Sequence, residues 1–257
     1  MLRNRVIPIL LNDKGGLVKT CKFKDPVYIG DPLNAIRIFN NKHVDELILL
    51  DIGRTRDGVP PDFELVRRVV SECFMPLGYG GGIRTLNDAQ KLFSFGVEKV
   101  ILQTITFDNM KVLEDIASFS GNHSVSISVD VKRDRNGAPK IYNSALGRVL
   151  DLDISEYLRS LESGGAGEIV LTSVDREGTF SGFDLELISL FKASLNIPLV
   201  VNGGAGSIED FQTAIDFGAE AVAAGSFFVF YSSRRGVLLN YPSPIDFNRR
   251  VRQGNQN

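Results

Sequence analysis

The chain is poor in the residue types that build disulfide frameworks and metal centres. Its 257 residues include two cysteines, two histidines and no tryptophan. Two cysteines are too few for a disulfide framework, and the spacing of Cys21 and Cys73 matches no metal site. Two reduced thiols are typical of a cytoplasmic protein, and we expect a cytoplasmic location. We expect neither a metal nor a cofactor.

Long apolar runs and an excess of one charge are also missing. No segment reaches the roughly 18 consecutive apolar residues that span a bilayer. Residues 1–5 are too charged to begin a secretory signal. The formal net charge is −2, and no long run of lysine and arginine is present. These features argue against nucleic acid or a membrane as the main partner.

The chain does contain a regular alternation of short apolar runs and amphipathic segments. The apolar runs are continuous in Val, Ile and Leu, which is typical of parallel strands covered on both faces. The expected strands are residues 6–11, 47–51, 76–79, 99–104, 124–130, 168–173, 198–202 and 221–226.

Helix starts can be read between these strands. Asp31 followed by Pro32 fits an N-cap with proline at the first helical position. Ser207 opens another helix, with acidic residues in its first turn. Eight strands alternating with eight segments predict an α/β fold, a (β/α)8 TIM barrel over residues 1–257 as one domain. A doubly wound open sheet is the alternative.

A repeated glycine-rich turn indicates that the barrel consists of two similar halves. Residues 80–88 read GGGIRTLND and residues 202–210 read NGGAGSIED, at a separation of 122 residues. The same offset aligns residues 95–98 with 217–220, and residues 46–49 with 168–171. The shared register predicts half-barrels of about 1–122 and 123–257.

Several of these glycines follow expected strands, where the active site of such a barrel lies. Backbone N–H groups left uncovered ahead of a helix bind phosphate well. The alternative is that the glycines only permit tight turns. Two loops in matched register favour anion binding, and therefore a ligand with two phosphates. The glycine-loop residues are Gly81, Gly82, Gly203, Gly204, Gly225 and Ser226.

Asp130 is the candidate acid. It ends an apolar strand, where partial desolvation raises the pKa of a carboxylate toward values useful in acid–base catalysis. A structural role is the alternative, as a helix cap or as a partner of Lys132 or Arg133. No nucleophile is evident, and both histidines precede strands on the wrong side of the barrel. Proton transfer on a bound phosphorylated sugar is the expected chemistry.

Four charged residues stand at strand starts, at the opposite mouth of the expected barrel. Arg5, Glu46, Lys99 and Glu168 comprise two positive and two negative side chains that could close into a neutral ring. Ordinary solvated charges, each worth little, are the alternative that the sequence taken alone favours.

Further short motifs lie along nearly the whole chain. They are Arg5-Val6-Ile7, Lys19, Asp31-Pro32, Asp45-Glu46-Leu47, Leu50-Asp51-Ile52, Gly80-Gly81-Gly82-Ile83, Glu98-Lys99-Val100, Asp130, Lys132-Arg133, Gly165-Ala166-Gly167-Glu168-Ile169, Thr172-Ser173, Asp175-Arg176, Gly178-Thr179, Ser181-Gly182 and Gly203-Gly204-Ala205-Gly206. With these residues the chain resembles the cyclase subunit, of HisF type, of imidazole glycerol phosphate synthase.

The resemblance implies a heterodimer in which a glutaminase subunit binds the N-terminal face of the barrel. Ammonia passes through the barrel and attacks a bisphosphorylated ribulosyl aminoimidazole carboxamide, giving imidazole glycerol phosphate and aminoimidazole carboxamide ribotide for histidine biosynthesis. The four charges correspond to the family's ammonia gate. Lys19 corresponds to a loop lysine that contacts substrate. Thr104 and Thr172, at strand ends, join the glycine-loop residues as expected substrate contacts.

The chain departs from the family at one catalytic position. The resemblance implies two aspartates, at the ends of the first and fifth strands; Asp130 matches the second, but residue 11 is Leu11. Strand parity places Leu11 on the same face as Arg5, about 20 Å further along the strand. A leucine cannot transfer a proton, and Asp13 is a speculative substitute. Glu177 stands where the family usually has aspartate.

Three functions follow from these residues. The first is the cyclase, with Asp130 and some replacement acid. The second is a paralogue that passes ammonia on for the amidination of a nucleotide-linked sugar in surface-polysaccharide biosynthesis, and Leu11 favours this interpretation. The third is a non-catalytic partner that only activates or positions the glutaminase.

Overall fold

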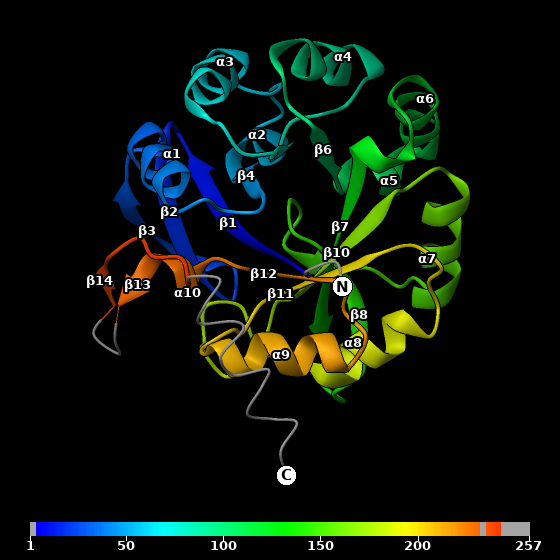
Figure 1. The fold of residues 1–257 in the computed structure, drawn as a ribbon. Helices are drawn as coiled ribbons and strands as arrows, with labels where there is room; N and C mark the ends of the chain where they lie inside the picture. Colours follow the sequence, from blue (N-terminus) through cyan, green and yellow to red (C-terminus); the bar gives the residue numbers. More distant parts are fainter. Residues whose placement is uncertain (1–3, 232–234, 243–257) are drawn as a thin grey trace.

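The computed structural model describes residues 4–231 and 235–242 and contains a closed barrel of parallel strands (Figure 1). Each barrel strand pairs with the next, and the last pairs with the first. The eight barrel strands are β1 (Arg5–Asp13), β4 (Leu47–Asp51), β5 (Leu77–Gly80), β6 (Lys99–Leu102), β7 (Val125–Arg133), β10 (Glu168–Ser173), β11 (Leu199–Asn202) and β12 (Ala221–Ala224). The predicted (β/α)8 barrel is confirmed, and the open sheet is wrong.

Helices surround the barrel on its outside (Figure 1). They are α1 (Pro32–Asn41), α2 (Ile52–Arg56), α3 (Phe63–Glu72), α4 (Leu86–Phe95), α5 (Thr104–Asp108), α6 (Met110–Ser120), the 3-10 turn η1 (Asn122–Ser124), α7 (Ile154–Ser163), α8 (Leu185–Lys192), α9 (Ile208–Asp216) and α10 (Ser226–Val229). The expected helix starts are confirmed. The Asp31 side chain accepts from the Asn34 N–H at 3.0 Å, and Ser207 forms a capping box with Asp210 at the start of α9.

Side-chain alternation along the strands separates two cores. On β1, Val6 and Leu10 pack outward against the helices. Ile7, Ile9 and Leu11 pack inward, with apolar residues from other strands, and fill the barrel. Because the period of a strand is two residues, Arg5 shares this inward face.

Two barrel strands are longer than predicted, because each continues into an antiparallel hairpin. β1 reaches Asp13 rather than residue 11, and β7 reaches Arg133 rather than residue 130. The extra residues pair with neighbouring strands, which the apolar pattern does not reveal. The hairpin strands are β2 (Gly16–Cys21), β3 (Lys24–Gly30), β8 (Pro139–Asn143) and β9 (Arg148–Val149).

Two other expected strands run too far. The segments 99–104 and 221–226 end as strands at Leu102 and Ala224, and the helices α5 and α10 then begin at Thr104 and Ser226. These short helices follow the fourth and eighth barrel strands. The half-barrel ranges of about 1–122 and 123–257 stay a prediction, and residues 243–257 lie outside the described part.

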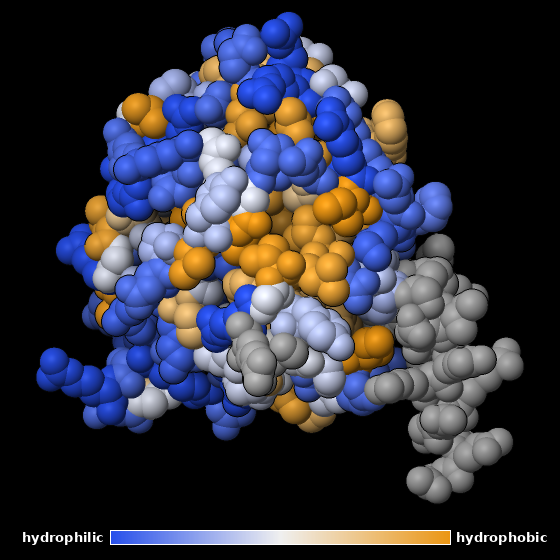
Figure 2. Space-filling view, turned by 90° about the vertical axis from the view of Figure 1, so that its left-hand side faces the viewer, coloured by the Kyte–Doolittle hydropathy of each residue, from blue (hydrophilic) through white to orange (hydrophobic). Residues whose placement is uncertain are grey.

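A small second sheet lies beside the first hairpin. It consists of β13 (Phe230–Tyr231) and β14 (Gly236–Val237). Figure 2 shows apolar side chains gathered on the side of the molecule where β3, β13 and β14 lie in Figure 1. Val27, Tyr28, Tyr231 and Val237 are exposed on these strands. Within residues 4–231 and 235–242, no helix is both long and apolar enough to cross a membrane.

Candidate active site

A cavity of about 490 Å³ opens at the carboxyl ends of the barrel strands. Sequence-predicted residues that line it are Lys19, Gly81, Gly82, Thr104, Asp130, Thr172 and Gly225. Three other predicted residues, Gly203, Gly204 and Ser226, are not among its lining residues. The cavity therefore unites most of the expected site, which lies where a barrel of this kind places its active site.

Asp130 is buried at the end of the inward face of β7. Its Oδ2 accepts from Gln103 Nε2 at 2.6 Å, and its Oδ1 accepts from Ser128 Oγ at 3.3 Å. Burial raises the pKa of Asp130 to about 6, against the opposing effect of these hydrogen bonds. A carboxyl group with such a pKa can both accept and return a proton near neutral pH.

Leu11 also lines the cavity, and it is only 8% exposed. It packs with Ile9 and Leu50 in the apolar barrel core. Asp13, the speculative substitute, is not among the cavity-lining residues, and its Oδ1 lies 3.8 Å from an Arg56 guanidinium nitrogen. The β1 corner of the site is therefore apolar.

Asp51 and Glu177 are further carboxylates of the cavity wall. Asp51 is buried, and its pKa is raised by burial against the opposing hydrogen bond that Asn12 donates to it at 2.9 Å. Glu177 accepts from Lys19 Nζ at 2.8 Å and from Thr20 Oγ1 at 3.1 Å. Both carboxylates are thus held by neighbouring side chains rather than directed at the cavity alone.

The position of the Lys19 side chain explains why residue 225 is a glycine. A Cβ placed on Gly225 would lie 2.4 Å from Lys19 Nζ. Lys19 is only 5% exposed, and the atoms that a Cβ would meet, Nζ and Cε, are the far end of its flexible side chain. The close approach of Lys19 Nζ is therefore possible because residue 225 has no Cβ.

The glycines of the two repeated loops are required by close backbone contacts. Gly81 has φ +118°, and a Cβ there would lie 2.3 Å from the Asp51 carbonyl oxygen. A Cβ on Gly204 would lie 2.1 Å from the carbonyl oxygen of Gly182. Glycine is thus required at residues 81 and 204 by the turn itself, whether or not these loops also bind a phosphate.

Hydrogen bonds already occupy several donors of these loops. The Gly82 N–H donates to Thr55 Oγ1 at 3.1 Å. Asp88 and Asp210 cap the N-termini of α4 and α9 with matching capping boxes. The expectation of uncovered N–H groups ahead of these two helices is therefore wrong at the capped positions, because each helix supplies its own anion.

The four charges at the opposite mouth close into an alternating ring. Arg5 contacts Glu46 at 2.5 Å and Glu168 at 2.7 Å. Lys99 contacts Glu46 and Glu168 at 3.0 Å each. Both carboxylates are nearly buried, whereas the side chains of Arg5 and Lys99 are 32% and 20% exposed. The solvated-charge interpretation is wrong, because each charge has two partners of opposite sign.

The ring is electrostatically self-consistent. Burial opposes ionisation of Glu168, but Lys99 and Arg5 outweigh it, so the pKa of Glu168 is lowered. Burial also disfavours the charge on Arg5, and the two glutamates outweigh it and raise its pKa. Ser126 Oγ donates to Glu168 Oε1 at 2.6 Å and extends the ring into the barrel.

Little protein separates the ring from the cavity floor. Ile9, Ile101 and Ser128 line the cavity, and Ile7 and Ser126, one inward position closer to the ring, are fully buried. An inward step on a strand is roughly 7 Å. One layer of packed side chains, apolar apart from Ser126, therefore lies between the two mouths.

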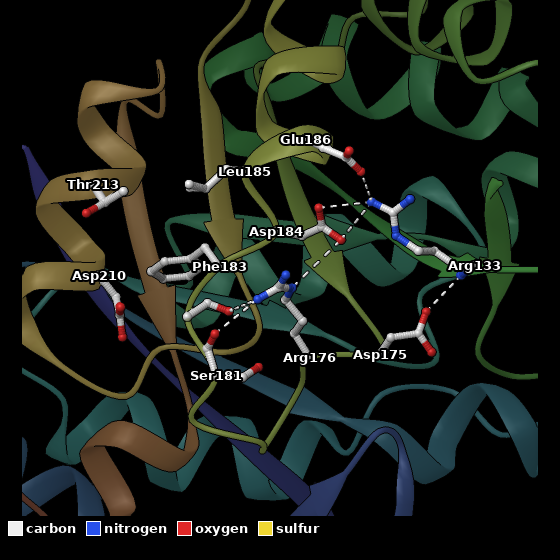
Figure 3. A pocket seen from close by; sticks show the side chains of 11 residues that line it. Arg133, Asp175, Arg176, Ser181, Phe183, Asp184, Leu185, Glu186, Asp210 and Thr213 are labelled. Carbon is white, nitrogen blue, oxygen red and sulfur yellow. Dashed lines mark hydrogen bonds and ion pairs between the residues drawn. The ribbon is translucent and has the colours of Figure 1, made fainter. Parts of the chain in front are cut away.

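A second cleft lies outside the barrel, near the start of α8 (Figure 3). Arg133 bonds to Asp184 and Glu186, and Arg176 donates to the backbone carbonyls of Ser181 and Gly182. Because these charged groups satisfy one another, the cleft is a structural ion-pair network. Among the described residues, no group of three potential ligands could hold a metal ion.

Sequence reasoning missed several polar residues of the cavity wall, among them Gln103 and Ser144. Gln103 shares the inward face of Lys99 and Ile101, so strand parity could have found it. Ser144 lies in the β8–β9 loop, and no sequence signal indicates that its Oγ reaches Gln103 Oε1 at 2.5 Å.

Fold and site together define a (β/α)8-barrel protein with an acid-containing cavity at one mouth and an ion-pair ring at the other. The sequence model of the family described as "Histidine biosynthesis protein" matches residues 5–234. The chain belongs to this family, and its relatives identify it as of HisF type.

The relatives match nearly end to end. A Leptospira interrogans protein, provisionally named imidazole glycerol phosphate synthase subunit HisF, is 44% identical over 96% of this chain and 98% of its own length. A Pseudomonas aeruginosa protein, provisionally named subunit hisF2 of the same synthase, is 46% identical over 94% of this chain and 97% of its own. The imidazole glycerol phosphate synthase subunit HisF of Exiguobacterium sibiricum is 35% identical over 89% of this chain and 91% of its own length.

Proposed function

We propose that this chain is the synthase subunit of a two-protein glutamine amidotransferase. It receives ammonia from a glutaminase subunit at the N-terminal mouth and uses it in the cavity beside Asp130. The observation that carries the proposal is the closed ring of Arg5, Glu46, Lys99 and Glu168, which lies one side-chain layer below the cavity floor. The names of the HisF relatives support the same assignment.

The ring is the proposed ammonia gate. Ammonia is small and neutral, so an apolar layer admits it while excluding charged solutes. Each arginine or lysine of the ring bridges two carboxylates, and opening the ring breaks two ion pairs at once. Docking of a glutaminase at this mouth would supply new partners for the freed charges.

The acceptor of the ring-closing reaction is a bisphosphorylated ribulosyl aminoimidazole carboxamide. Its phosphates would lie at the glycine loops, one near Gly81 and Gly82 with Thr104, the other at Gly225, which is the member of the second group (Gly203, Gly204, Gly225 and Ser226) that lines the cavity. Thr172 and Lys19 face the same cavity. A phosphate would compete with Glu177 for Lys19, whose ammonium group already holds one anion.

Leu11 favours a second candidate function. Ring closure in this family uses two aspartates, and in this chain the β1 corner is formed by Leu11, Ile9 and Leu50. A subunit that passes ammonia to a different acceptor, such as a nucleotide-linked sugar amidinated with the help of a separate synthetase, needs no acid at that corner.

One assay separates the two functions. Purified protein receives the bisphosphate and an ammonium salt, and imidazole glycerol phosphate is measured beside equilibrium binding of the bisphosphate. Product from the unaltered chain supports the cyclase. Binding without turnover, with turnover gained in Leu11→Asp, supports the altered chemistry.

A matched control is Val18→Asp. Val18 pairs with Leu11 across the β1–β2 hairpin and has the same 8% exposure, but it does not line the cavity. An acid there is expected to restore nothing. If the unaltered chain and Leu11→Asp both fail to bind the bisphosphate, the proposed acceptor site is refuted.

A further inference from the structure

The loss of an acid at Leu11 makes the surroundings of Asp130 decisive. A reaction that needs a base and then an acid draws both forms from Asp130 if Asp51 and Glu177, the other carboxylates of the cavity wall, stay held by Asn12 and Lys19. Gln103 donates a short hydrogen bond to Asp130, with Nε2 2.6 Å from Oδ2. Hydrogen bonds donated to a carboxylate favour its charged form, and those accepted from the acid favour the neutral form.

Gln103 is itself held by a loop residue. Ser144 Oγ donates to Gln103 Oε1 at 2.5 Å, which leaves Nε2 directed at Asp130. The two faces of a glutamine amide are a donor and an acceptor of nearly the same shape, and only the hydrogen-bond network selects between them. The backbone of Gln103 is fixed separately, because its carbonyl accepts from Thr106 Oγ1 at 2.6 Å.

Ser144 comes from an exposed part of the cavity wall. It lies in the loop between β8 and β9, and it is exposed although its hydroxyl reaches inward. Leu146 of the same loop also lines the cavity and is 59% exposed. Its N–H donates to the buried Asn143, so the loop has a defined turn of its own. A ligand entering the cavity meets this loop.

We propose that Ser144 and Gln103 are positioning residues that couple the β8–β9 loop to the proton on Asp130. With Ser144 docked, Gln103 presents its N–H and Asp130 is a carboxylate that accepts a proton from the ligand. With Ser144 withdrawn, the amide turns, Oε1 accepts the Oδ2–H of the acid, and Asp130 holds that proton. Redocking turns the N–H back toward Oδ2 and returns the proton to the ligand, so no proton is gained or lost over the cycle.

The other groups around Asp130 do not supply this control. Ser128 of β7 and Thr172 of β10 donate to it and lie on barrel strands, and Ser144 itself is the last and weakest of the hydrogen-bonding groups that favour the charged form. The titratable groups that sense its charge are Tyr142 of β8 and Tyr157 of α7. Burial raises the pKa of both phenols, so both stay neutral across the range in which Asp130 titrates. Lys19 and Glu177, which also line the cavity, form an ion pair with each other.

The test measures the pKa of Asp130 directly and needs neither acceptor nor glutaminase. Carboxyl carbons of the full chain are labelled with carbon-13, the Asp130 signal is assigned by its loss in Asp130→Asn, and its pH midpoint is followed by NMR. Gln103→Met, which removes both faces of the amide, is expected to raise the midpoint by about one unit, a tenfold gain in proton affinity. Ser144→Ala is expected to raise it by roughly half a unit.

The double variant decides the mechanism. If Ser144 acts mainly through Gln103, Ser144→Ala shifts the midpoint much less in a Gln103→Met background than on its own, because only the weak direct hydrogen bond of Ser144 to Asp130 is then lost. Additive shifts would overturn the coupling, as would a fall of the midpoint in Ser144→Ala, which indicates simple hydration. The matched control is Gln212→Met, which breaks a surface Gln–Asp hydrogen bond of 2.8 Å and is expected to leave the midpoint unchanged.

The coupling of Ser144 and Gln103 to the proton on Asp130 rests on the proposed function only in so far as that proton takes part in catalysis. If the chain forms no product with any acceptor but the non-additive shifts are found, the proposed function fails and the coupling stands. If turnover is found and both variants leave the midpoint unchanged, the coupling fails alone.

Discussion

Removal of Lys99 from the ion-pair ring is expected to destabilise the protein in a pH-dependent way. Lys99 lies 3.0 Å from Glu46 and from Glu168, whose side chains are 4% and 6% exposed. Breaking a buried ion pair from one side costs about 3–5 kcal/mol, because a buried charge is left unpaired. Arg5 retains both glutamates, and Lys99 is a fifth exposed, so we expect a loss of about 2–3 kcal/mol at pH 8 for Lys99→Met.

The sign of the pH dependence follows from Glu168. Its pKa is lowered in the folded protein, so its stabilising contribution is present above the unfolded value of about 4.3 and is lost as pH falls through the folded value. In Lys99→Met this lowering is weakened, and protonation relieves the unpaired charge at higher pH. The loss is therefore expected to shrink to about 1 kcal/mol at pH 4.5.

Urea unfolding of both proteins between pH 4.5 and pH 8 measures this difference. Lys140→Met is the control, since Lys140 pairs at 3.1 Å with an Asp151 side chain that is 99% exposed, and its loss is expected to stay under about 0.5 kcal/mol at every pH. Glu168→Gln combined with Lys99→Met is expected to recover part of the stability. An equal loss at both pH values, or no difference from Lys140→Met, would refute the electrostatic account of the ring.

Three further predictions follow from the cavity wall. The pKa of Asp130 is raised to about 6, so wild-type stability falls as pH rises from about 4 to 6. Asp130→Asn is therefore expected to be more stable than wild type by about 1–3 kcal/mol at pH 7.5 and no more stable at pH 4. Thermal or urea unfolding measures both differences. Gly225→Ala is expected to displace mainly the flexible end of Lys19, with the Ile9 carbonyl oxygen 3.2 Å from the new Cβ, so stability changes by less than about 1 kcal/mol. Calorimetric binding of a phosphorylated ligand is expected to weaken about tenfold, and unchanged binding would remove Lys19 from the phosphate site. Gly81→Ala is expected to lose about 2 kcal/mol or more in urea unfolding, because its Cβ meets the Asp51 backbone at a positive φ, and a loss as small as that of Gly225→Ala would contradict the strained-turn account.

The barrel strands could be predicted from sequence because they are continuous apolar runs, and six of the eight extend no more than one residue beyond their predicted ends. The exceptions, β1 and β7, continue into hairpins that form only because β2 and β8 lie alongside. Helix starts were equally legible at Asp31 and Ser207, where the capping side chain is local. The ends of β1 and β7 are set by pairing with β2 and β8, and a short window of sequence does not contain this pairing.

The candidate site divides in the same way. Asp130 and Leu11 could be placed at the cavity because strand position and parity fix where an inward side chain emerges. Gln103 and Ser144 could not be joined in advance, because they belong to elements 41 residues apart whose contact depends on the course of a loop. The glycine loops show the reverse case, since their pattern suggested free donors and the structure gives several of those donors partners within the protein.

The alternation of strands and helices, the inward and outward faces of each strand, and the leucine at residue 11 in place of an acid follow from the amino-acid sequence, because they depend on a two-residue period and on residue identity. Tertiary structure alone decided that Arg5, Glu46, Lys99 and Glu168 form a ring rather than four solvated charges. Their closure depends on the curvature that brings β1, β4, β6 and β10 around one axis, and side chains up to 163 residues apart meet only when the sheet closes.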